Sequence, residues 1–342
     1  MIQSFALYRL PHADHYTRIE GQAQKLSSCK DLEGQQGFVV APFEITEDQP
    51  IVLIRPDRVE RVALPQLSAA PSHVSRLTSH VSPSYHTDFS HFHAQLRQRV
   101  FRKIVLARRA DESLPEGVSV QNLFMRACAN YPRVFVALVH TPQSGTWLTA
   151  TPEILLEGCG GQWQTMALAG TMKLENEQLA GEGETVRWST KNIQEQRLVA
   201  TYIAECLKAL HADYREEGPY TVRAANLVHL RSDFSFTLPQ GQSVSDLLGR
   251  LHPTPAVCGL PKADTYRFIT ASEHTPRRYY SGFMGPVGEE THLYVSLRCM
   301  NIEGDTCRLY AGGGLLKDSV EEQEWLETEA KMETMRRILF SN

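Results

Sequence analysis

Hydrophobic and polar positions alternate with different periods along this chain, and the changes of period predict where strands and helices lie. Near-alternation, typical of strands, marks residues 103–111 and a meander over residues 279–314. A spacing of three to four residues, typical of amphipathic helices, marks residues 118–130, the later part of residues 181–210 and the run ending at Leu339. Because hairpins join the strands and helices are interspersed, the pattern predicts a mainly antiparallel α+β fold rather than a doubly wound one.

The N-terminal part has a weaker pattern. Ser90 is predicted to cap a helix over residues 91–101, after a loop at residues 63–84 that is rich in Pro, Ser and His. Short apolar runs predict strands at residues 5–11, 37–43 and 51–56. Later strands are predicted at residues 134–141, 145–158, 163–173 and within 221–239, and helices at residues 244–251 and 263–273.

The segment from Leu309 to Lys331 joins a glycine run to a helix with acidic side chains. Consecutive glycines let a backbone approach a ligand and aim N–H donors at a carboxylate or phosphate. The helix places Glu324, Glu327 and Lys331 on one face. This arrangement could hold a metal ion together with an acidic substrate. Taken alone, the helix is better explained as a solvated face with a Glu327–Lys331 surface pair.

Three charged residues occur in apolar surroundings. Lys103 shares a strand face with apolar neighbours and is either a lysine that reaches water or a desolvated amine able to act as a general base. Glu153 follows Pro152 inside an apolar run, so it lies at a polar edge or is buried with a raised pKa and acts as a general acid. Glu195, at the margin of an apolar helix stripe, needs either a bound cation or an arginine as partner.

Other candidates have common structural explanations. His229 lies in a strand, where a histidine is usually a core or edge residue with satisfied hydrogen bonds. Arg298 lies among apolar residues in a predicted strand and either forms a salt bridge or clamps a carboxylate through two hydrogen bonds. The Gly170–Thr171 corner is a turn or a ligand contact. The prolines of residues 252–261 predict a rigid loop suited to shaping a pocket.

Composition narrows the classes of function. The 342 residues are 42% hydrophobic and 22% charged with a net charge of −4, which is ordinary for a globular protein and does not favour a nucleic-acid partner. No apolar run predicts a membrane span, and the first residues do not resemble a signal peptide. Seven scattered cysteines without a CxxC pair indicate reduced thiols and a cytoplasmic location. Thirteen histidines without HExxH spacing favour a hard, oxygen-ligated metal over zinc.

The combination of short motifs resembles the chorismate-utilising enzymes, most closely the isochorismate synthases. The motifs occur in that family's order from about residue 85 onward, and residues 1–85 are not covered by the resemblance. The matching strings are KIVLAR (103–108), TPEILL (151–156), LAGT (168–171), NIQEQRLV (192–199), NLVHL (226–230), LHPTPAVCGLP (251–261), YYSGFMG (279–285), LYVSLRC (293–299), YAGGG (310–314) and EWLETEAK (324–331).

The resemblance implies one large α+β fold in which antiparallel sheets and flanking helices enclose a buried site that depends on Mg²⁺. Residues 1–85 are then N-terminal strands and a loop of the same fold, and residues 86–342 form the chorismate-binding catalytic region. The implied catalytic residues are Lys103 as base and Glu153 as acid. The implied metal ligands are Glu195, Glu324 and Glu327. The implied substrate contacts are Gly170, Thr171, His229, Ala256, Val257, Tyr280, Arg298, Gly312 and Lys331.

The implied reaction converts chorismate to isochorismate, with water attacking C2 and the C4 hydroxyl leaving. A base and an acid of opposite starting protonation suit this exchange. One alternative is a salicylate synthase, which also eliminates pyruvate. Another is a non-catalytic homologue that binds chorismate, and the presence of all four key acid, base and metal residues argues against it. The product could serve menaquinone or siderophore synthesis. A monomer is expected.

Overall fold

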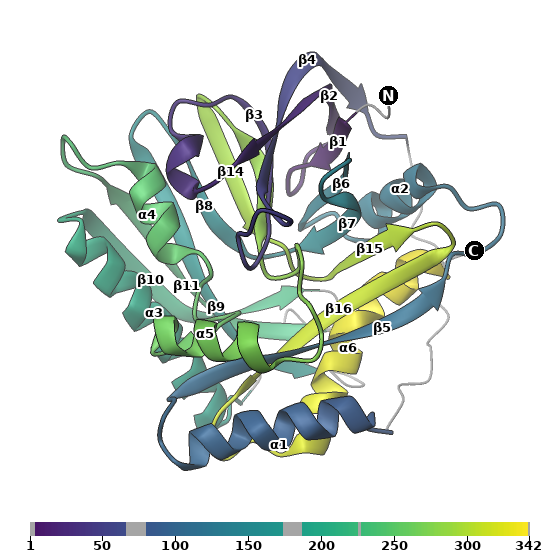
Figure 1. Ribbon diagram of the computed structural model, residues 1–342. Helices are drawn as coiled ribbons and strands as arrows, with labels where there is room; N and C mark the ends of the chain where they lie inside the picture. The colour runs from purple at the N-terminus through teal and green to yellow at the C-terminus, as the bar shows by residue number, and fades with distance from the viewer. Residues whose placement is uncertain (1–3, 66–79, 174–186, 225–226, 341–342) are drawn as a thin grey trace.

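The computed structural model describes residues 4–65, 80–173, 187–224 and 227–340, whose order along the chain Figure 1 shows. Parts of the loops predicted at residues 63–84 and 181–186, and two residues of the strand region 221–239, lie outside these ranges. The strands are β1 Ser4–Arg9, β2 His15–Leu26, β3 Gly37–Ala41, β4 Ile51–Ala63, β5 Lys103–Ser113, β6 Phe135–Thr141, β7 Gly145–Thr151, β8 Ile154–Cys159, β9 Gln162–Lys173, β10 Asp213–Ala224, β11 Leu227–Thr237, β12 Gly259–Leu260, β13 Phe283–Val287, β14 Glu290–Val295, β15 Cys299–Glu303 and β16 Thr306–Leu315. The helices are η1 Cys29–Leu32, α1 Pro83–Arg97, α2 Val120–Asn130, α3 Thr190–Ala209, α4 Val244–Leu251, α5 Lys262–Ser272 and α6 Glu321–Leu339.

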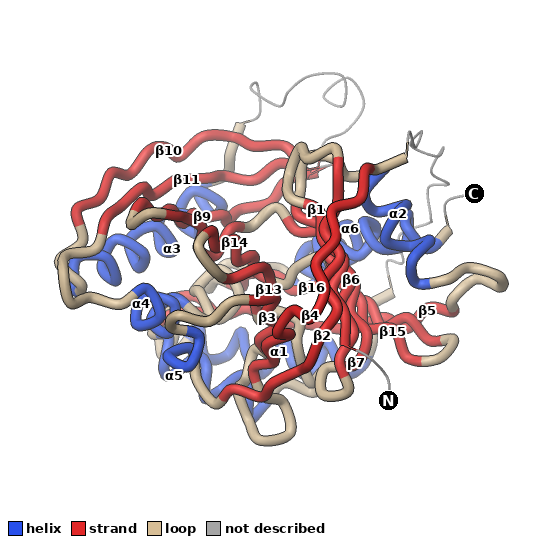
Figure 2. The backbone as a smooth tube through the Cα atoms, turned by 90° about the horizontal axis from the view of Figure 1, so that it is seen from above, coloured by secondary structure: helices blue, strands red, loops and turns tan. Residues whose placement is uncertain are grey.

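All ladders between the described strands are antiparallel, which confirms the predicted α+β class. The strands form one continuous ladder in the order β10-β11-β9-β8-β14-β13-β3-β4-β2-β1-β6-β7-β15-β16-β5-β12. The ladder is not flat: in Figure 2, β10 and β11 run at a steep angle to β1, β2 and β6. Helix α3 packs on β9 and β11, and α6 packs on β16, so these two helices approach the same region from different strands (Figure 1).

The N-terminal strands are part of this sheet. Strand β1 pairs with β6, and β3 pairs with β13 near the other end of the chain. Strand β2 was not predicted, because its sequence HYTRIEGQAQKL contains few apolar residues. It is held mainly by its long register with β4. The division at residue 85 stays a prediction.

Helix α1 begins earlier than predicted. Ser82, not Ser90, is its N-cap, and the Ser82 hydroxyl accepts a hydrogen bond from the Tyr85 N–H at 3.3 Å. Pro83 follows in the first turn, where its missing N–H costs nothing. The buried stripe that fixes the helix starts at Tyr85 and includes Phe89 and Phe92. The histidines and serines between these aromatic residues hide the helical period in the sequence.

Two residues predicted inside strands lie at breaks between strands. Glu153 lies between β7 and β8, because Pro152 has no N–H to continue the ladder. Arg298 lies between β14 and β15 with a φ of +45°, a left-handed conformation that ends the strand. The Glu153 carbonyl still accepts from the Val295 N–H at 3.0 Å, so the breaks lie close together in the fold. Interrupted strands therefore aim both side chains away from the regular sheet.

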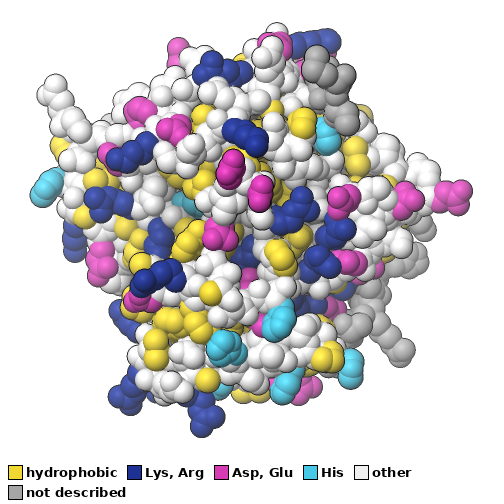
Figure 3. All heavy atoms as spheres, viewed as in Figure 1, with side chains coloured by type: hydrophobic (Ala, Val, Ile, Leu, Met, Phe, Trp, Pro, Cys, Tyr) yellow, Lys and Arg dark blue, Asp and Glu magenta, His cyan; other side chains and the backbone are white. Residues whose placement is uncertain are grey.

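The surface and the thiols agree with the composition. On the face seen in Figure 3, acidic and basic side chains are interspersed. All seven cysteines lie in described parts of the chain and are free thiols. Within the described residues, no helix combines the length and the apolar character that crossing a bilayer requires.

A buried ion pair ties three segments together behind the sheet. The Arg277 guanidinium lies 2.6 and 2.7 Å from the two Glu273 carboxylate oxygens. It also donates to the carbonyls of Val257 at 2.6 Å and Val105 at 2.8 Å. Glu273 accepts in turn from the Ala107 N–H at 2.7 Å. The pair therefore links strand β5 to the proline-rich loop and to the end of α5.

Removing the negative charge from this pair should destabilise the fold. In Glu273→Gln, the Arg277 charge stays buried without a counter-charge, and we expect a loss of about 3 kcal/mol of unfolding free energy. Chemical denaturation measures the change. The matched control is Asp264→Asn, which breaks the exposed Arg267–Asp264 pair on the same helix and should cost less than about 1 kcal/mol. Equal losses in the two variants would contradict the prediction.

Candidate active site

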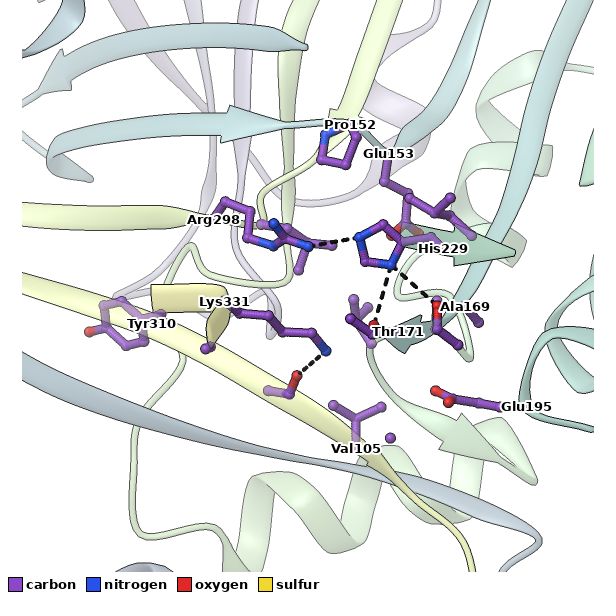
Figure 4. A pocket seen from close by; sticks show the side chains of 18 of the residues that line it. Val105, Pro152, Glu153, Ala169, Thr171, Glu195, His229, Arg298, Tyr310 and Lys331 are labelled. Atoms are coloured by element: carbon purple, nitrogen blue, oxygen red, sulfur yellow. Dashed lines mark hydrogen bonds between the residues drawn. The ribbon is translucent and has the colours of Figure 1, made fainter. Parts of the chain in front are cut away.

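One cavity lies where the broken strands, the proline-rich loop and helices α3 and α6 meet. It has room for several water molecules, with about 60 Å³ open to their centres. Eleven of the fourteen predicted site residues line it: Glu153, Gly170, Thr171, Glu195, His229, Ala256, Val257, Tyr280, Arg298, Gly312 and Lys331. Figure 4 shows many of these side chains converging on the centre of the cavity.

Three predicted residues do not line the cavity. Lys103 is fully buried and lies just behind the lining, with its ammonium 3.1 Å from a Glu195 carboxylate oxygen. Its Cε is 3.1 Å from where a side chain on Gly314 would begin. Glu324 and Glu327 lie on α6, beside the glycine run. The structure thus groups the predicted residues in one region, and their roles stay predictions.

Glu153 has the environment of a protonated acid. Its side chain is only 2% exposed, and no described hydrogen bond satisfies its carboxyl oxygens. Burial raises the pKa of Glu153 to about 8, although the charges of Lys103, Lys331 and Arg298 act to lower it. The carboxyl therefore carries its proton at neutral pH and can donate it to a leaving group.

Arg298 and His229 form a buried cationic wall of the cavity. The Arg298 Nη2 lies 3.0 Å from His229 Nε2, as Figure 4 shows. Burial, reinforced by the Arg298 and Lys331 charges, lowers the pKa of His229 well below its usual value, so the ring is neutral. Its Nε2 then accepts from Arg298, and its Nδ1–H donates to the Gly170 carbonyl at 3.2 Å.

Arg298 is a buried cation that lacks a carboxylate counter-ion. Among the residues the structure describes, none provides a carboxylate within ion-pair distance of this guanidinium. Its contacts are His229 and a 3.5 Å hydrogen bond to the Thr334 hydroxyl. Burial lowers the pKa of Arg298, which shows that its charge is poorly compensated. A carboxylate of a ligand would complete it through charge-assisted hydrogen bonds.

The glycine run is part of a strand rather than a loop that cradles an anion. Gly312, Gly313 and Gly314 lie within β16, paired with Ala107, Leu106 and Val105 of β5. A Cβ on Gly312 would lie 2.8 Å from the Tyr280 hydroxyl, and one on Gly314 would lie 2.1 Å from Glu195 Oε1. The absence of side chains therefore lets Tyr280 and Glu195 reach the strand backbone.

The three predicted metal ligands are each paired with a lysine. Glu195 contacts Lys103, Glu327 accepts from Lys331 at 2.7 Å, and Glu324 contacts Lys191. Across the described residues, no three acidic, histidine or cysteine side chains form a group that could hold a metal ion as they stand. Even so, the donors fit a hard divalent cation, because they are carboxylate oxygens. Glu324 Oε2 is buried and has no hydrogen-bond partner, as an oxygen awaiting a cation would be.

Sequence reasoning missed several residues of this region. Lys191 contacts Glu324 from the first turn of α3, where a positive charge opposes the helix dipole. That unfavourable placement is a signal that the sequence contained. Gly314 was present in the recognised motif but was not assigned a role. Val105, Leu297 and Tyr310, which also line the cavity, are ordinary core residues in sequence, and only the fold identifies them.

The fold and the cavity together define a class of protein: an antiparallel α+β protein with a small cavity lined by buried acidic and basic side chains. Comparison with protein families identifies the particular family. The family described as chorismate binding enzyme matches residues 48–340, and this chain belongs to that family.

Relatives of known name support this assignment. Isochorismate synthase DhbC of Bacillus subtilis is 29% identical over 258 residues, which cover 72% of this chain and 65% of the relative. Isochorismate synthase MenF of Escherichia coli K12 is 30% identical over 240 residues, which cover 69% of this chain and 56% of the relative. The alignments thus span less than two thirds of the length of these relatives.

Solved structures share the chorismate-utilising fold. MenF, the menaquinone-specific isochorismate synthase from Escherichia coli, superposes with a TM-score of 0.82 at 22% identity and covers 99% of this chain and 89% of its own. Anthranilate synthase component I from Streptococcus pneumoniae TIGR4 superposes with a TM-score of 0.68 at 15% identity. The superposition covers 93% of this chain and 80% of the anthranilate synthase chain. At such identities the likeness establishes the fold alone.

The raised pKa of Glu153 predicts a pH-dependent cost in stability. The native carboxyl holds its proton up to about pH 8, whereas the unfolded chain releases it near the ordinary value of 4.5. The native state therefore binds the extra proton between these values, and its stability falls as the pH rises through them. Glu153→Gln removes this cost. From pH 5 to pH 8, the unfolding free energy of the variant should therefore rise relative to that of the parent protein by up to about 4 kcal/mol.

Urea denaturation at the two pH values measures this gain. The control is Glu289→Gln, which neutralises an exposed carboxylate just before β14 and should follow the parent protein at both pH values. A constant difference between Glu153→Gln and the parent would show that the Glu153 carboxyl is already ionised at pH 5.

Proposed function

We propose that this chain is an isochorismate synthase that converts chorismate to isochorismate with the help of Mg²⁺. One observation carries the proposal: a buried, proton-bearing carboxyl and a buried guanidinium without a carboxylate partner face the same small cavity. Chorismate carries two carboxylates and a hydroxyl that must leave. The cavity offers a clamp for one carboxylate and a proton donor for the hydroxyl. Family membership and the names of the relatives agree with this assignment.

The substrate is oriented by groups on the deep wall of the cavity. Arg298 binds one carboxylate and is itself aligned by neutral His229. Tyr280, in the turn before β13, and the Gly312 backbone on β16 contact the same end of the ligand. Ala256 and Val257 border the ring, and Gly170, Thr171 and Lys331 complete the substrate contacts.

The proton transfers fall to Glu153 and Lys103. Glu153 donates its proton to the C4 hydroxyl as the C–O bond breaks. Lys103 lies beside Glu195 and beside Gly314 of β16. It removes a proton from the water that attacks C2, and the ring double bonds shift as the hydroxyl leaves C4. Lys103 must be a neutral amine for this step, so its contact with Glu195 has to loosen before reaction. The charge of Lys103 acts on Glu153, which keeps the two groups energetically coupled.

Glu195, Glu324 and Glu327 are the residues that would hold Mg²⁺. A bound Mg²⁺ supplies a positive charge that neutralises and orients a substrate carboxylate. The chain's own contribution is to bring these oxygens from α3 and α6 to the two sides of the glycine run. Gly313 permits this on the α6 side, since a Cβ there would lie 3.1 Å from Glu324 Oε2.

Product analysis tests the function. The purified chain incubated with chorismate and Mg²⁺ should form isochorismate, identified by chromatography and NMR, without pyruvate. Chelation with EDTA should stop turnover, and added Mg²⁺ should restore it. Salicylate with an equal amount of pyruvate would instead identify a salicylate synthase, which uses the same first step. No conversion of chorismate would identify a non-catalytic homologue.

Substitution of Lys103 tests the mechanism. Lys103→Ala removes the base and should reduce kcat by roughly 100- to 10,000-fold, the usual contribution of a positioned proton-transfer group. Circular dichroism should show an unchanged fold. Lys317→Ala, an exposed lysine in the loop before α6, is the control and should keep parental activity. Near-normal activity of Lys103→Ala would make the assignment of the base wrong.

A further inference from the structure

The acidic residues around the glycine run are already balanced by lysines of the same chain. Three carboxylates face three ammonium groups: Glu195 with Lys103, Glu327 with Lys331, and Glu324 with Lys191. Lys103 and Lys331 have roles in the proposed reaction, whereas Lys191 has none. A divalent cation that enters this balanced group adds two positive charges, so one of the lysines has to give way.

The position of Lys191 on its helix is unfavourable for a positive charge. It is the second residue of α3, after the N-cap Ser189, where the helix dipole repels a cation. Its side chain nevertheless reaches a carboxylate 133 residues away in sequence. Burial acts against its charge, but Glu324, and then Glu327 and Glu195, raise the pKa of Lys191 above its usual value. The acidic group therefore holds this ammonium against the preference of the helix.

Glu324 is only partly satisfied by this contact. The carboxylate is 1% exposed, and only its Oε1 meets the Lys191 ammonium. Its Oε2 is buried without a hydrogen-bond partner. Burial and the neighbouring Glu327 both disfavour the charge of this carboxylate, and Lys191 and the Ser319 side chain offset that only in part. A small cation of higher charge would satisfy both oxygens better than the ammonium does.

Of the three lysines, Lys191 has the easiest way out. Its side chain is 29% exposed, compared with 16% for Lys331 and 0% for Lys103. Lys331 also donates to the Gly312 carbonyl at 2.8 Å, a second hydrogen bond that holds it in place. A long flexible stem lets an ammonium at this depth move into water with little rearrangement.

We propose that Lys191 is a built-in counter-ion of the metal-free protein, which occupies Glu324 until a divalent cation displaces it into solvent. The proposal rests on the proposed function only in taking Glu324 and Glu327 as cation ligands. Lys191 would then set the strength of metal binding without contacting substrate. Its removal has an effect opposite to that of removing an ordinary site residue: the metal binds more tightly.

Binding of Mn²⁺ alone, without substrate, measures the strength of this competition. Free Mn²⁺ is followed by EPR during titration of the full chain. Lys191→Met should bind Mn²⁺ about tenfold more tightly or better, because a competing charge within contact distance is gone. Lys191→Arg should bind it more weakly, because a guanidinium can hold Glu324 through two hydrogen bonds. Lys317→Met removes an exposed lysine near α6 and should leave the affinity within twofold. Equal affinity of Lys191→Met and the parent would overturn the proposal.

Chemical labelling tests displacement itself and separates it from simple repulsion. The parent protein is treated briefly with acetic anhydride, with and without saturating Mn²⁺, and acetylation of Lys191 and Lys317 is quantified by mass spectrometry. Displacement predicts a severalfold rise in Lys191 labelling with Mn²⁺, no change at Lys317, and no rise at Lys191 in Glu324→Gln. An unchanged or reduced rate at Lys191 would show that the ammonium stays in place.

The two proposals fail in different ways. If Lys191 becomes exposed on metal binding but the protein does not convert chorismate, the counter-ion proposal stands and the isochorismate synthase assignment is refuted. Turnover of chorismate without any change at Lys191 would refute the counter-ion alone. A parent protein and a Lys191→Met variant that both fail to bind Mn²⁺ would overturn the counter-ion as well.

Discussion

Desolvation of charge in one small cavity is the constraint on which this structure depends. Taking a carboxylate or an ammonium out of water costs on the order of several kcal/mol unless a partner compensates it. Glu195 and Glu324 are each paired with a lysine, and Arg298 hydrogen-bonds to a neutral histidine. Glu153 avoids the desolvation cost by keeping its proton. Each solution leaves a distinct chemical state, and together they give the cavity an acid, a clamp and a cation-binding edge.

The backbone around the cavity makes this arrangement of charged side chains possible. Glycines at 312 and 314 are needed because any side chain there would collide with Tyr280 or Glu195. The strand breaks at Glu153 and Arg298 turn two side chains out of the ladder that would otherwise point along its faces. The Glu273–Arg277 pair joins Val105 to Val257, so the strand that begins with Lys103 and the loop that borders the ring are tied to each other. Fold stability and site geometry therefore share the same contacts.

The sequence predicted the antiparallel class, most elements and the membership of the site, but it could not predict how the parts meet. Nine short motifs between residues 151 and 331 located eleven lining residues, since motif residues converge on one place in a shared fold. Strand β2 and the start of α1 were missed, because long-range pairing and aromatic packing, not local periodicity, hold them. The pairing of Lys191 with Glu324 joins positions 133 residues apart, and no local pattern carries that information.

Strands carry the most buried charged groups around the cavity, and helices carry most of the partly exposed ones. Lys103, Glu153 and Arg298 are nearly unexposed and lie on strands or at strand breaks, where packing on both sides fixes their positions. Lys191, Glu327 and Lys331 lie on helices α3 and α6 and keep 29%, 24% and 16% of their side chains exposed. A ligand or a cation therefore meets the more exposed side chains on the helix side of the cavity. Acid–base chemistry needs fixed distances, whereas ligand entry and cation exchange need movement. Placing the first on strands and the second on helices lets one cavity meet both requirements.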